Sequence, residues 1–177
     1  METKHVIIQR RSCRHYKQLT IDDNMITTLL QAAYAAPVAC GLYDCVRITV
    51  ITNQQFLYDW DHACMPPFST KEVHPLYGAP VQLLISARIS ENIPMGNPYI
   101  NAGCIAENIA LCATDLGLGS VLLAAPVRVL NKVESLLTKL ELPPSFIPIL
   151  SVAIGWPESQ QEERTRPTHF VSTDWLC

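Results

Sequence analysis

The densest group of residues capable of chemistry lies near the amino end of the chain, in the run Arg10-Arg11-Ser12-Cys13-Arg14. Each guanidinium group offers a planar fork of N–H donors that matches phosphate oxygens, and a serine hydroxyl can add a neutral hydrogen bond. The run therefore indicates a site for a phosphate-bearing ligand. The alternative is a solvated basic turn that contacts no ligand, because short motifs also occur without function.

Seven cysteines form a second candidate group. Their number is odd and we find no export signal, so we expect reduced thiols rather than a disulfide framework. No C-x-x-C pair occurs, and the nearest pair, Cys40 and Cys45, has no histidine beside it, so we expect no metal site. Cys104 and Cys112 are eight residues apart in a helical pattern and share one face, which favours packing. A thiol or metal protein stays open as an alternative.

The other titratable residues are isolated in the sequence. His62 and His74 each stand alone, and a lone histidine is more often structural than catalytic. Asp59 and Asp61 fall in a helical pattern, and we predict that they form a solvated face. The motif Gly117-x-Gly119 follows a predicted helix instead of a strand and has no third glycine, so it does not predict a dinucleotide-binding βαβ unit.

Length and charge limit the class of protein. A chain of 177 residues fits one domain, and a net charge of −3 disfavours a nucleic-acid binder, which needs a basic surface. The amino end lacks the apolar core of a signal peptide, and no apolar run approaches the roughly 18 to 20 residues of a membrane-spanning helix. We expect a soluble, cytoplasmic protein with one domain over residues 1–177.

Hydrophobic periodicity predicts the elements that must position these residues. The predicted helices cover 3–11, 20–36, 54–63, 101–116 and 126–140. The predicted strands cover 46–52, 81–87, 120–123 and 147–154. Helices come first and then alternate with strands, without a repeat or a low-complexity linker, so the order favours an α+β fold around a layered sheet.

Two of these segments carry further information. The helix over 101–116 has small or apolar residues on a wide face, which predicts a central position, and Gly117 stands at its expected carboxyl-terminal cap. The tail over 157–177 is polar until Phe170, Val171, Trp175 and Leu176. We therefore expect the tail to extend from the domain and dock on another surface.

Several short segments resemble the FMN-dependent nitroreductase family, in the order in which that family has them. They are R-R-S-x-R at 10–14, Ala36-Pro37, Gly78-Ala79-Pro80-Val81, Asn101-Ala102-Gly103, Glu107-Asn108, Leu116-Gly117-Leu118-Gly119-Ser120 and Gly155-Trp156-Pro157. The match runs across most of the chain. It implies a three-layer α/β/α sandwich with a central, mostly antiparallel sheet, forming an intertwined homodimer with FMN held between the subunits.

The resemblance also implies the reaction, in which NAD(P)H passes a hydride through FMN to a small acceptor such as a nitroaromatic, a quinone or an enone. No side chain acts as a catalytic nucleophile in this scheme, because the cofactor carries the chemistry. Arg10 and Ser12 would face the flavin phosphate, and Arg14 would lie toward the N1/O2 edge of the isoalloxazine. Arg11 could serve either place.

Three more segments are implied to contact the cofactor. The late basic residues that would close over the phosphate are Arg164 and Arg166. The segment that would pack against the flavin and offer a backbone N–H to N5 is Leu122, Leu123, Ala124 and Ala125. The segment that would reach the flavin from the other subunit is Pro37, Val38, Ala39 and Gly41, and residues 157–177 would dock on that same partner.

The chain departs from the family pattern in three places. Val38, Gly41 and Tyr43 stand where serine, asparagine and glutamine are common, so the usual substrate contacts change. Two alanines at 124–125 replace an acidic residue or glycine. The connection over 90–99 is short, which predicts a more open pocket. These departures keep a second function open, a non-catalytic flavin-binding or flavin-storage protein.

Overall fold

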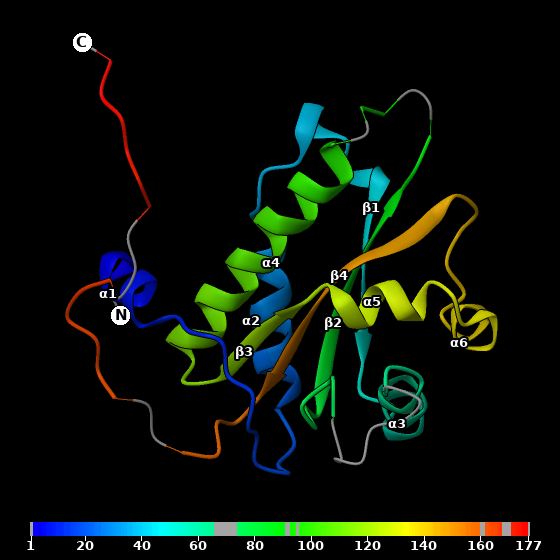
Figure 1. Ribbon diagram of the computed structural model, residues 1–177, viewed down its shortest axis with the longest axis horizontal. Coiled ribbons are helices and arrows are strands. Elements are labelled where there is room, and N and C mark those ends of the chain that lie inside the picture. The colour runs from blue at the N-terminus through cyan, green and yellow to red at the C-terminus, as the bar shows by residue number, and fades with distance from the viewer. Residues whose placement is uncertain are drawn as a thin grey trace.

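The computed structural model of this protein describes residues 2–65, 74–90, 93–94, 96–159, 162–167 and 171–176. Four strands in these ranges pair into one sheet in the order β1-β2-β4-β3, and each neighbouring pair is antiparallel (Figure 1). The strands are β1 (Val46–Ile51), β2 (Val81–Arg88), β3 (Gly119–Leu123) and β4 (Phe146–Gly155). Because β2 and β4 are central, β1 and β3 form the two edges of the sheet.

Helices cover both faces of this sheet. One face carries α2 (Asp23–Tyr34) and α4 (Asn97–Asp115), and the other carries α3 (Gln54–Ala63), α5 (Ala125–Leu130) and α6 (Glu134–Lys139). The short helix α1 (Thr3–Gln9) contacts α4, and two 3-10 turns, η1 (Ala39–Gly41) and η2 (Tyr43–Cys45), lead from α2 to β1. The predicted α+β fold, a three-layer sandwich around an antiparallel sheet, is confirmed.

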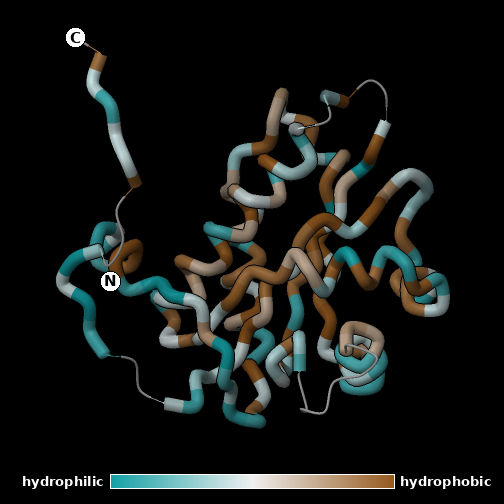
Figure 2. The backbone as a smooth tube through the Cα atoms, in the orientation of Figure 1, coloured by the Kyte–Doolittle hydropathy of each residue, from teal (hydrophilic) through white to brown (hydrophobic). Residues whose placement is uncertain are grey.

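The alternation of side chains along the strands builds one core on each face of the sheet. Leu83 and Ile85 of β2 pack with α2 and α4, whereas Leu84 packs with α3 and α5 around the fully buried Trp60. A strand covered on both faces favours a nearly continuous apolar sequence, as β2 has. Figure 2 shows the hydrophobic strands at the centre and the hydrophilic segment after α1 on the outside.

The central helix α4 begins at Asn97, four residues before the predicted start, and ends at the glycine cap that the sequence predicts. Gly117 has a φ of 75°, and its N–H donates to Thr114 O over 3.1 Å, while Leu118 N donates to Ala113 O over 2.8 Å. These two bonds satisfy carbonyl groups in the last turn. No helix within the described residues, α4 included, is long and apolar enough to cross a membrane.

The prediction of one helix over 126–140 is wrong, because α5 and α6 are separate helices. The chain leaves helical geometry at Val133, with φ −108° and ψ 89°. In the break, Asn131 Nδ2 donates to Pro148 O over 2.9 Å, a contact with β4 that the local sequence does not reveal. The bend allows both Leu130 and Leu136 to be buried in the same core.

Candidate functional site

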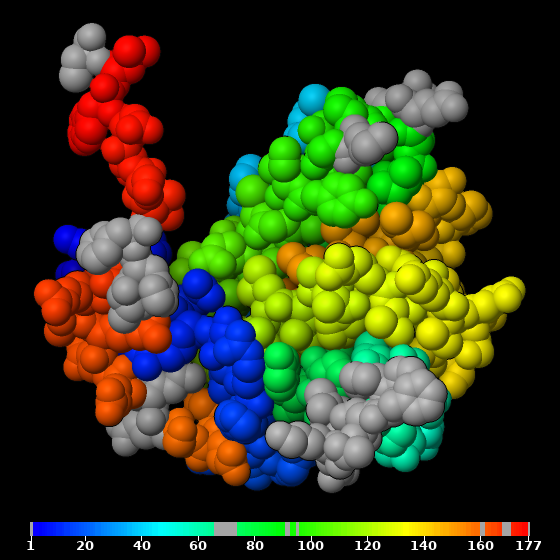
Figure 3. Space-filling view, viewed as in Figure 1, coloured from blue at the N-terminus to red at the C-terminus, as the bar shows by residue number. Residues whose placement is uncertain are grey.

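The arginine-rich run lies along the free edge of β3. Cys13 N donates to Ser120 O over 2.8 Å, and Ser12 forms a parallel bridge with Ser120. Farther on, Lys17 N donates to Trp156 O over 2.8 Å. Figure 3 shows this blue segment on the surface, between the orange tail and the yellow-green residues of β3 and α5. The backbone after α1 is thus fastened to the sheet while its arginine side chains reach the surface.

Two buried side chains of this segment, Cys13 and Tyr16, act as its anchors. The Tyr16 hydroxyl donates to Cys13 O over 2.8 Å, and burial raises the pKa of Tyr16 well above its ordinary value, so the phenol stays a neutral donor. A Cβ at Gly119 would lie 2.6 Å from Cys13 Sγ, and a Cβ at Gly155 would lie 2.6 Å from Tyr16 Cδ1. The segment therefore fits only against glycine at these positions. The sequence analysis missed both anchors.

The three arginines of the run have different partners. Arg10 Nε lies 3.0 Å from Glu107 Oε1 of α4, and since a guanidinium has five N–H donors, this contact does not exhaust it. Arg11 donates through Nε to Gln9 O over 3.3 Å. The Arg14 guanidinium carbon lies 5.9 Å from the centre of the Tyr77 ring. Arg14 and Ser12 are exposed, so both can contact a ligand from solvent.

The tail returns to this segment and brings a further arginine. Gln9 Nε2 donates to Arg164 O over 2.6 Å, and Arg164 N donates to Gln9 Oε1 over 3.1 Å. Burial first, and then the positive charge of Arg164, lower the pKa of Arg11. The structure thus brings Arg11 and Arg164 together, and a dianion such as a phosphate monoester is the ligand that offsets two neighbouring guanidinium charges. Arg166 is exposed two residues farther along.

Residues 122–125 follow directly along the same edge. Leu123 is buried, Leu122 is half-buried, and Ala124 and Ala125 are exposed. Backbone groups alternate in direction along an antiparallel strand, so Leu122 directs its N–H and C=O to the same outer side as Ser120, whose carbonyl accepts from Cys13. This edge can supply a backbone donor next to the arginine-rich run, whatever its side chains are.

The segment over 37–41 contacts a different part of α4 from the arginine-rich run. Ala39 N donates to Asn101 Oδ1 over 3.0 Å, near the start of α4, whereas Arg10 contacts Glu107. Six residues along a helix correspond to positions about 120° apart around its axis. Pro37 and Gly41 are exposed, whereas Val38 is buried and Ala39 is half-buried. One copy of the chain therefore does not bring Pro37, Val38, Ala39 and Gly41 to the arginines.

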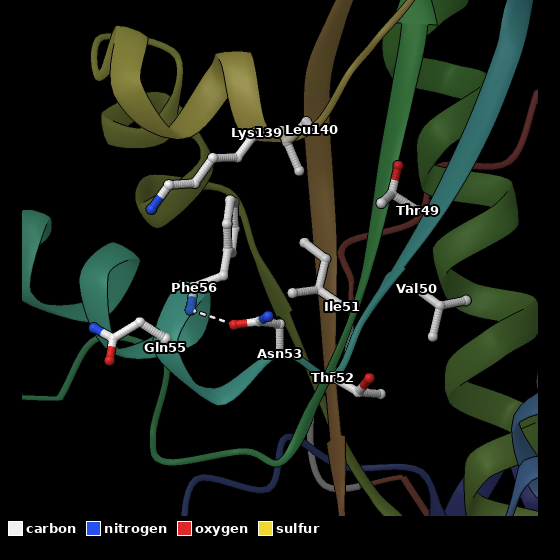
Figure 4. A pocket seen from close by; sticks show the side chains of 9 residues that line it. All are labelled: Thr49, Val50, Ile51, Thr52, Asn53, Gln55, Phe56, Lys139 and Leu140. Carbon is white, nitrogen blue, oxygen red and sulfur yellow. Dashed lines mark hydrogen bonds between the residues drawn. The ribbon is translucent and has the colours of Figure 1, made fainter.

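Four cavities, of about 310, 400, 480 and 490 Å³, lie away from the arginine-rich run. The one of about 480 Å³ lies beside β1, at the opposite edge of the sheet from β3, between α3 and α6 (Figure 4). Lys139, which lines this cavity, pairs through Nζ with Asp59 Oδ2 over 3.1 Å. None of these four cavities is lined by residues 10–14.

The prediction that Asp59 and Asp61 form a solvated face is wrong for Asp61, which is buried. Its carboxylate accepts a hydrogen bond from Leu76 N over 2.7 Å and lies 2.7 Å from His74 Nδ1. Asp59, by contrast, is partly exposed and pairs with Lys139. Across the described residues, no group of three or more histidines, cysteines, aspartates or glutamates is arranged to hold a metal ion.

Known proteins similar to this chain identify its family. The family model described as the nitroreductase family matches residues 7–156. A protein of Archaeoglobus fulgidus, provisionally named NADH dehydrogenase/NAD(P)H nitroreductase, is 27% identical over 98% of this chain and 99% of its own length. Structures of nitroreductases with bound FMN from Desulfitobacterium hafniense and Bacteroides fragilis have the same fold, with TM-scores of 0.83 and 0.81 and identities of 19% and 20%. Each alignment covers 99% of this chain and at least 99% of the other. The chain therefore belongs to the nitroreductase family.

Proposed function

We propose that this protein is an FMN-dependent oxidoreductase that uses NAD(P)H to reduce a small acceptor such as a nitroaromatic, a quinone or an enone. We further propose that it works as a cytoplasmic homodimer with one domain per chain. The family match, the relatives named for NAD(P)H and the FMN-bound structures of the same fold support the activity. All six described cysteines are free thiols, in keeping with a reducing compartment.

The observation that carries the proposal is the convergence of guanidinium groups beside the free edge of β3. Arg11 and Arg164 are close enough that the charge of one lowers the pKa of the other, and Ser12 lies next to them in the chain. Such a donor set fits the phosphate of FMN, because arginine binds phosphate through paired, charge-assisted hydrogen bonds. The residues present therefore fit the cofactor.

We assign Arg10, Arg11, Ser12, Arg164 and Arg166 to the phosphate end of the cofactor. When bound, FMN supplies the hydride chemistry, and the protein contributes position and electrostatic field. We assign Arg14 to the N1/O2 edge of the flavin ring, where a cation stabilises negative charge. The outward backbone of Leu122, with Leu123 and the exposed residues Ala124 and Ala125, would hold the ring by main-chain contacts that need no particular side chain.

A second copy would complete the site. In one copy Ala39 of the segment over 37–41 contacts Asn101, whereas Arg10 contacts Glu107, and this supports a role for the segment in a neighbouring subunit. The tail supports the same arrangement, since Val171, Trp175 and Leu176 expose 90%, 88% and 104% of their surface in a single copy. We propose that the tail over 157–177 docks on the partner through its exposed end, 171–176, while residues 162–166 stay at Gln9 and Arg11 of their own copy. We also propose that Pro37, Val38, Ala39 and Gly41 approach the partner's cofactor. Phe170 lies outside the described residues.

FMN uptake and reduction test this proposal directly. Protein reconstituted with FMN is separated from free flavin, and NADH or NADPH is added without oxygen while the flavin absorbance is followed. We expect stoichiometric uptake and bleaching by at least one nucleotide. Replacing Arg10 and Arg14 together by alanine should weaken uptake tenfold or more, since a hydrogen bond to a charged group contributes about 1.5–3 kcal/mol.

The matched control is Arg47→Ala, which removes one exposed arginine from β1 at the far edge of the sheet and should leave uptake unchanged. A wild-type protein that takes up no FMN in excess cofactor contradicts the proposal. So does a double variant that binds FMN as tightly as the wild type, because the arginines would then contact nothing.

The altered 37–45 segment supports a second candidate, a flavin-binding or flavin-storage protein without turnover. Val38 is buried and apolar, and residues 37–45 contain none of the serine, asparagine and glutamine side chains that the family pattern has here. In that case the protein takes up FMN but neither nucleotide bleaches it. The short connection between β2 and α4 also leads us to expect an exposed flavin, which iodide quenches efficiently; a shielded ring would contradict this expectation.

A further inference from the structure

We propose that Gln9 is a positioning residue that closes the carboxyl-terminal segment 162–166 over the phosphate and so makes the site select FMN over unphosphorylated flavin. The proposal rests on the proposed function, because it concerns the same site. It assigns a role to a residue outside the arginine-rich run, at the last position of α1.

The side chain of Gln9 pairs with the backbone of Arg164 through two hydrogen bonds, an arrangement that we call the clamp. Its carboxamide donates through Nε2 to Arg164 O over 2.6 Å and accepts through Oε1 from Arg164 N over 3.1 Å. This pairing uses both backbone groups of one residue, as a β-bridge does, across 155 positions of sequence. A carboxamide is required for it, because the clamp needs a donor and an acceptor on one planar group.

Arg11 joins the same cluster from the other side. Its Nη2 donates to Gln9 Oε1 over 3.3 Å and to the carbonyl oxygen of Glu162. Gln9 therefore links the guanidinium of Arg11 to the backbone of Arg164. Around them, His5 Nε2 lies 3.9 Å from Glu163 Oε1, and the charge of Glu162 acts on Arg11.

The charges make this closure depend on an anion. The positive charges of Arg11 and Arg164 repel each other, and the nearby negative charge of Glu162 opposes this repulsion. A bound phosphate attracts both arginines and favours the closed segment. The clamp and the phosphate therefore stabilise each other, which is the reciprocal coupling expected of two ligands of one conformation.

Binding of FMN and of riboflavin separates this role from a general effect on folding. The variant Gln9→Ala should raise the dissociation constant for FMN about tenfold, the loss expected for two hydrogen bonds, and leave that for riboflavin within twofold. Gln55→Ala is the control, because Gln55 makes a side-chain bond to Asp59 on α3, away from the arginines. It should change neither constant. Gln9→Met keeps the length of the side chain and repeats the test if Gln9→Ala folds poorly.

Tryptic cleavage of the Arg164–Thr165 bond gives a second readout, which needs no flavin. Cleavage in this segment reports on that bond, because the bond after Arg166 precedes Pro167 and resists trypsin. Inorganic phosphate should slow this cleavage severalfold in the wild type and have no effect in Gln9→Ala. Equal FMN and riboflavin losses, or phosphate protection that survives in Gln9→Ala and Gln9→Met, overturn the inference while the proposed function stands. A wild type that takes up no FMN overturns the proposed function instead.

Discussion

At the scale of single residues, burial decides what the thiols can do. Cys64 is half-buried and donates to Pro126 O over 3.7 Å, and burial, followed by the charge of Asp61, raises its pKa to about 11. Burial also raises the pKa of Cys112, and Cys13 is buried as an anchor. Nucleophilic cysteines show the opposite, a lowered pKa at an accessible site. These thiols therefore do not support a thiol-based function.

Alkylation tests this view of Cys64. The thiolate is the reactive form, so with a pKa of about 11 only about one part in a thousand is reactive at pH 8 in the folded protein. We expect iodoacetamide to label Cys64 about a hundredfold more slowly than in unfolded protein, where the ordinary value is 9.0, and the folded rate to keep rising up to about pH 11. Peptide mapping by mass spectrometry measures both rates. Equal labelling of folded and unfolded chains would contradict the prediction.

Asp61 carries the prediction about stability. Its carboxylate accepts the buried N–H of Leu76, so Asp61→Ala leaves that donor without its partner, and we expect a loss of about 2 kcal/mol in the free energy of unfolding. Asp61→Asn keeps an acceptor and should lose less. Asp59→Ala, which removes a partly exposed ion pair, should cost less than either change at Asp61. Urea unfolding of the three variants checks the order, and an Asp61→Ala variant as stable as Asp59→Ala would refute it.

The two aspartates also show what the sequence could not reveal at this scale. Both fall in one helical pattern. Helical periodicity does not distinguish a carboxylate that forms an ion pair with a lysine, as Asp59 does, from one that accepts a hydrogen bond from a distant backbone N–H, as Asp61 does. Cys13, Tyr16 and Gln9 were missed for the same reason. Their partners are Gly119, Ala153 and Arg164, which lie more than 100 residues away in the chain.

At the scale of elements, the arginine-rich run depends on how closely it approaches β3. A methyl group at Gly119 would lie 2.6 Å from Cys13 Sγ and 2.7 Å from Cys13 Cβ, far inside van der Waals contact. We expect Gly119→Ala to lower stability by about 1–3 kcal/mol, as overpacking does, and to weaken FMN uptake because the arginines shift with Cys13. Thermal unfolding and flavin titration measure the two effects.

A double-mutant cycle gives the control for this contact. Cys13→Gly removes the two nearest atoms that Gly119→Ala would meet, so the double variant should be less destabilised than the sum of the two single variants. Additive losses would mean that the two residues do not touch and that the run is held by other contacts.

The elements themselves were largely predictable, because most are amphipathic or bounded by strong signals. The helix predicted over 54–63 coincides with α3, where Asn53 accepts from Phe56 N as an N-cap. The prediction over 126–140 failed where a tertiary bond from Asn131 to β4 outweighs the local pattern. The helix predicted from Thr20 begins later, at Asp23, because Asp22 is the residue that caps it.

At the scale of the whole molecule, the candidate site was predictable in its parts but not in its arrangement. Arginine type and spacing predict a phosphate ligand, which stays a prediction, and the structure brings Arg164 near Arg11. The separation of residues 37–41 from Arg10 became visible only in three dimensions, because it depends on which side of α4 each segment meets. That separation, together with the exposed tail, leads to the final prediction.

The tail should bury its apolar residues in the proposed homodimer. Trp175 exposes 88% of its surface in one copy, whereas Trp60 is fully buried and Trp156 is half-buried, so only Trp175 should change its environment strongly on association. Subtracting the emission of Trp175→Phe from that of the wild type should give a blue-shifted spectrum at micromolar concentration and a solvent-exposed spectrum on dilution. Deleting residues 171–177 should weaken the dimer in sedimentation equilibrium without unfolding the chain, since the described part of this segment, 171–176, lies outside both cores. A Trp175 spectrum that stays solvent-exposed at every concentration, with an undiminished dimer after the deletion, would place the tail in solvent and the contact between subunits elsewhere.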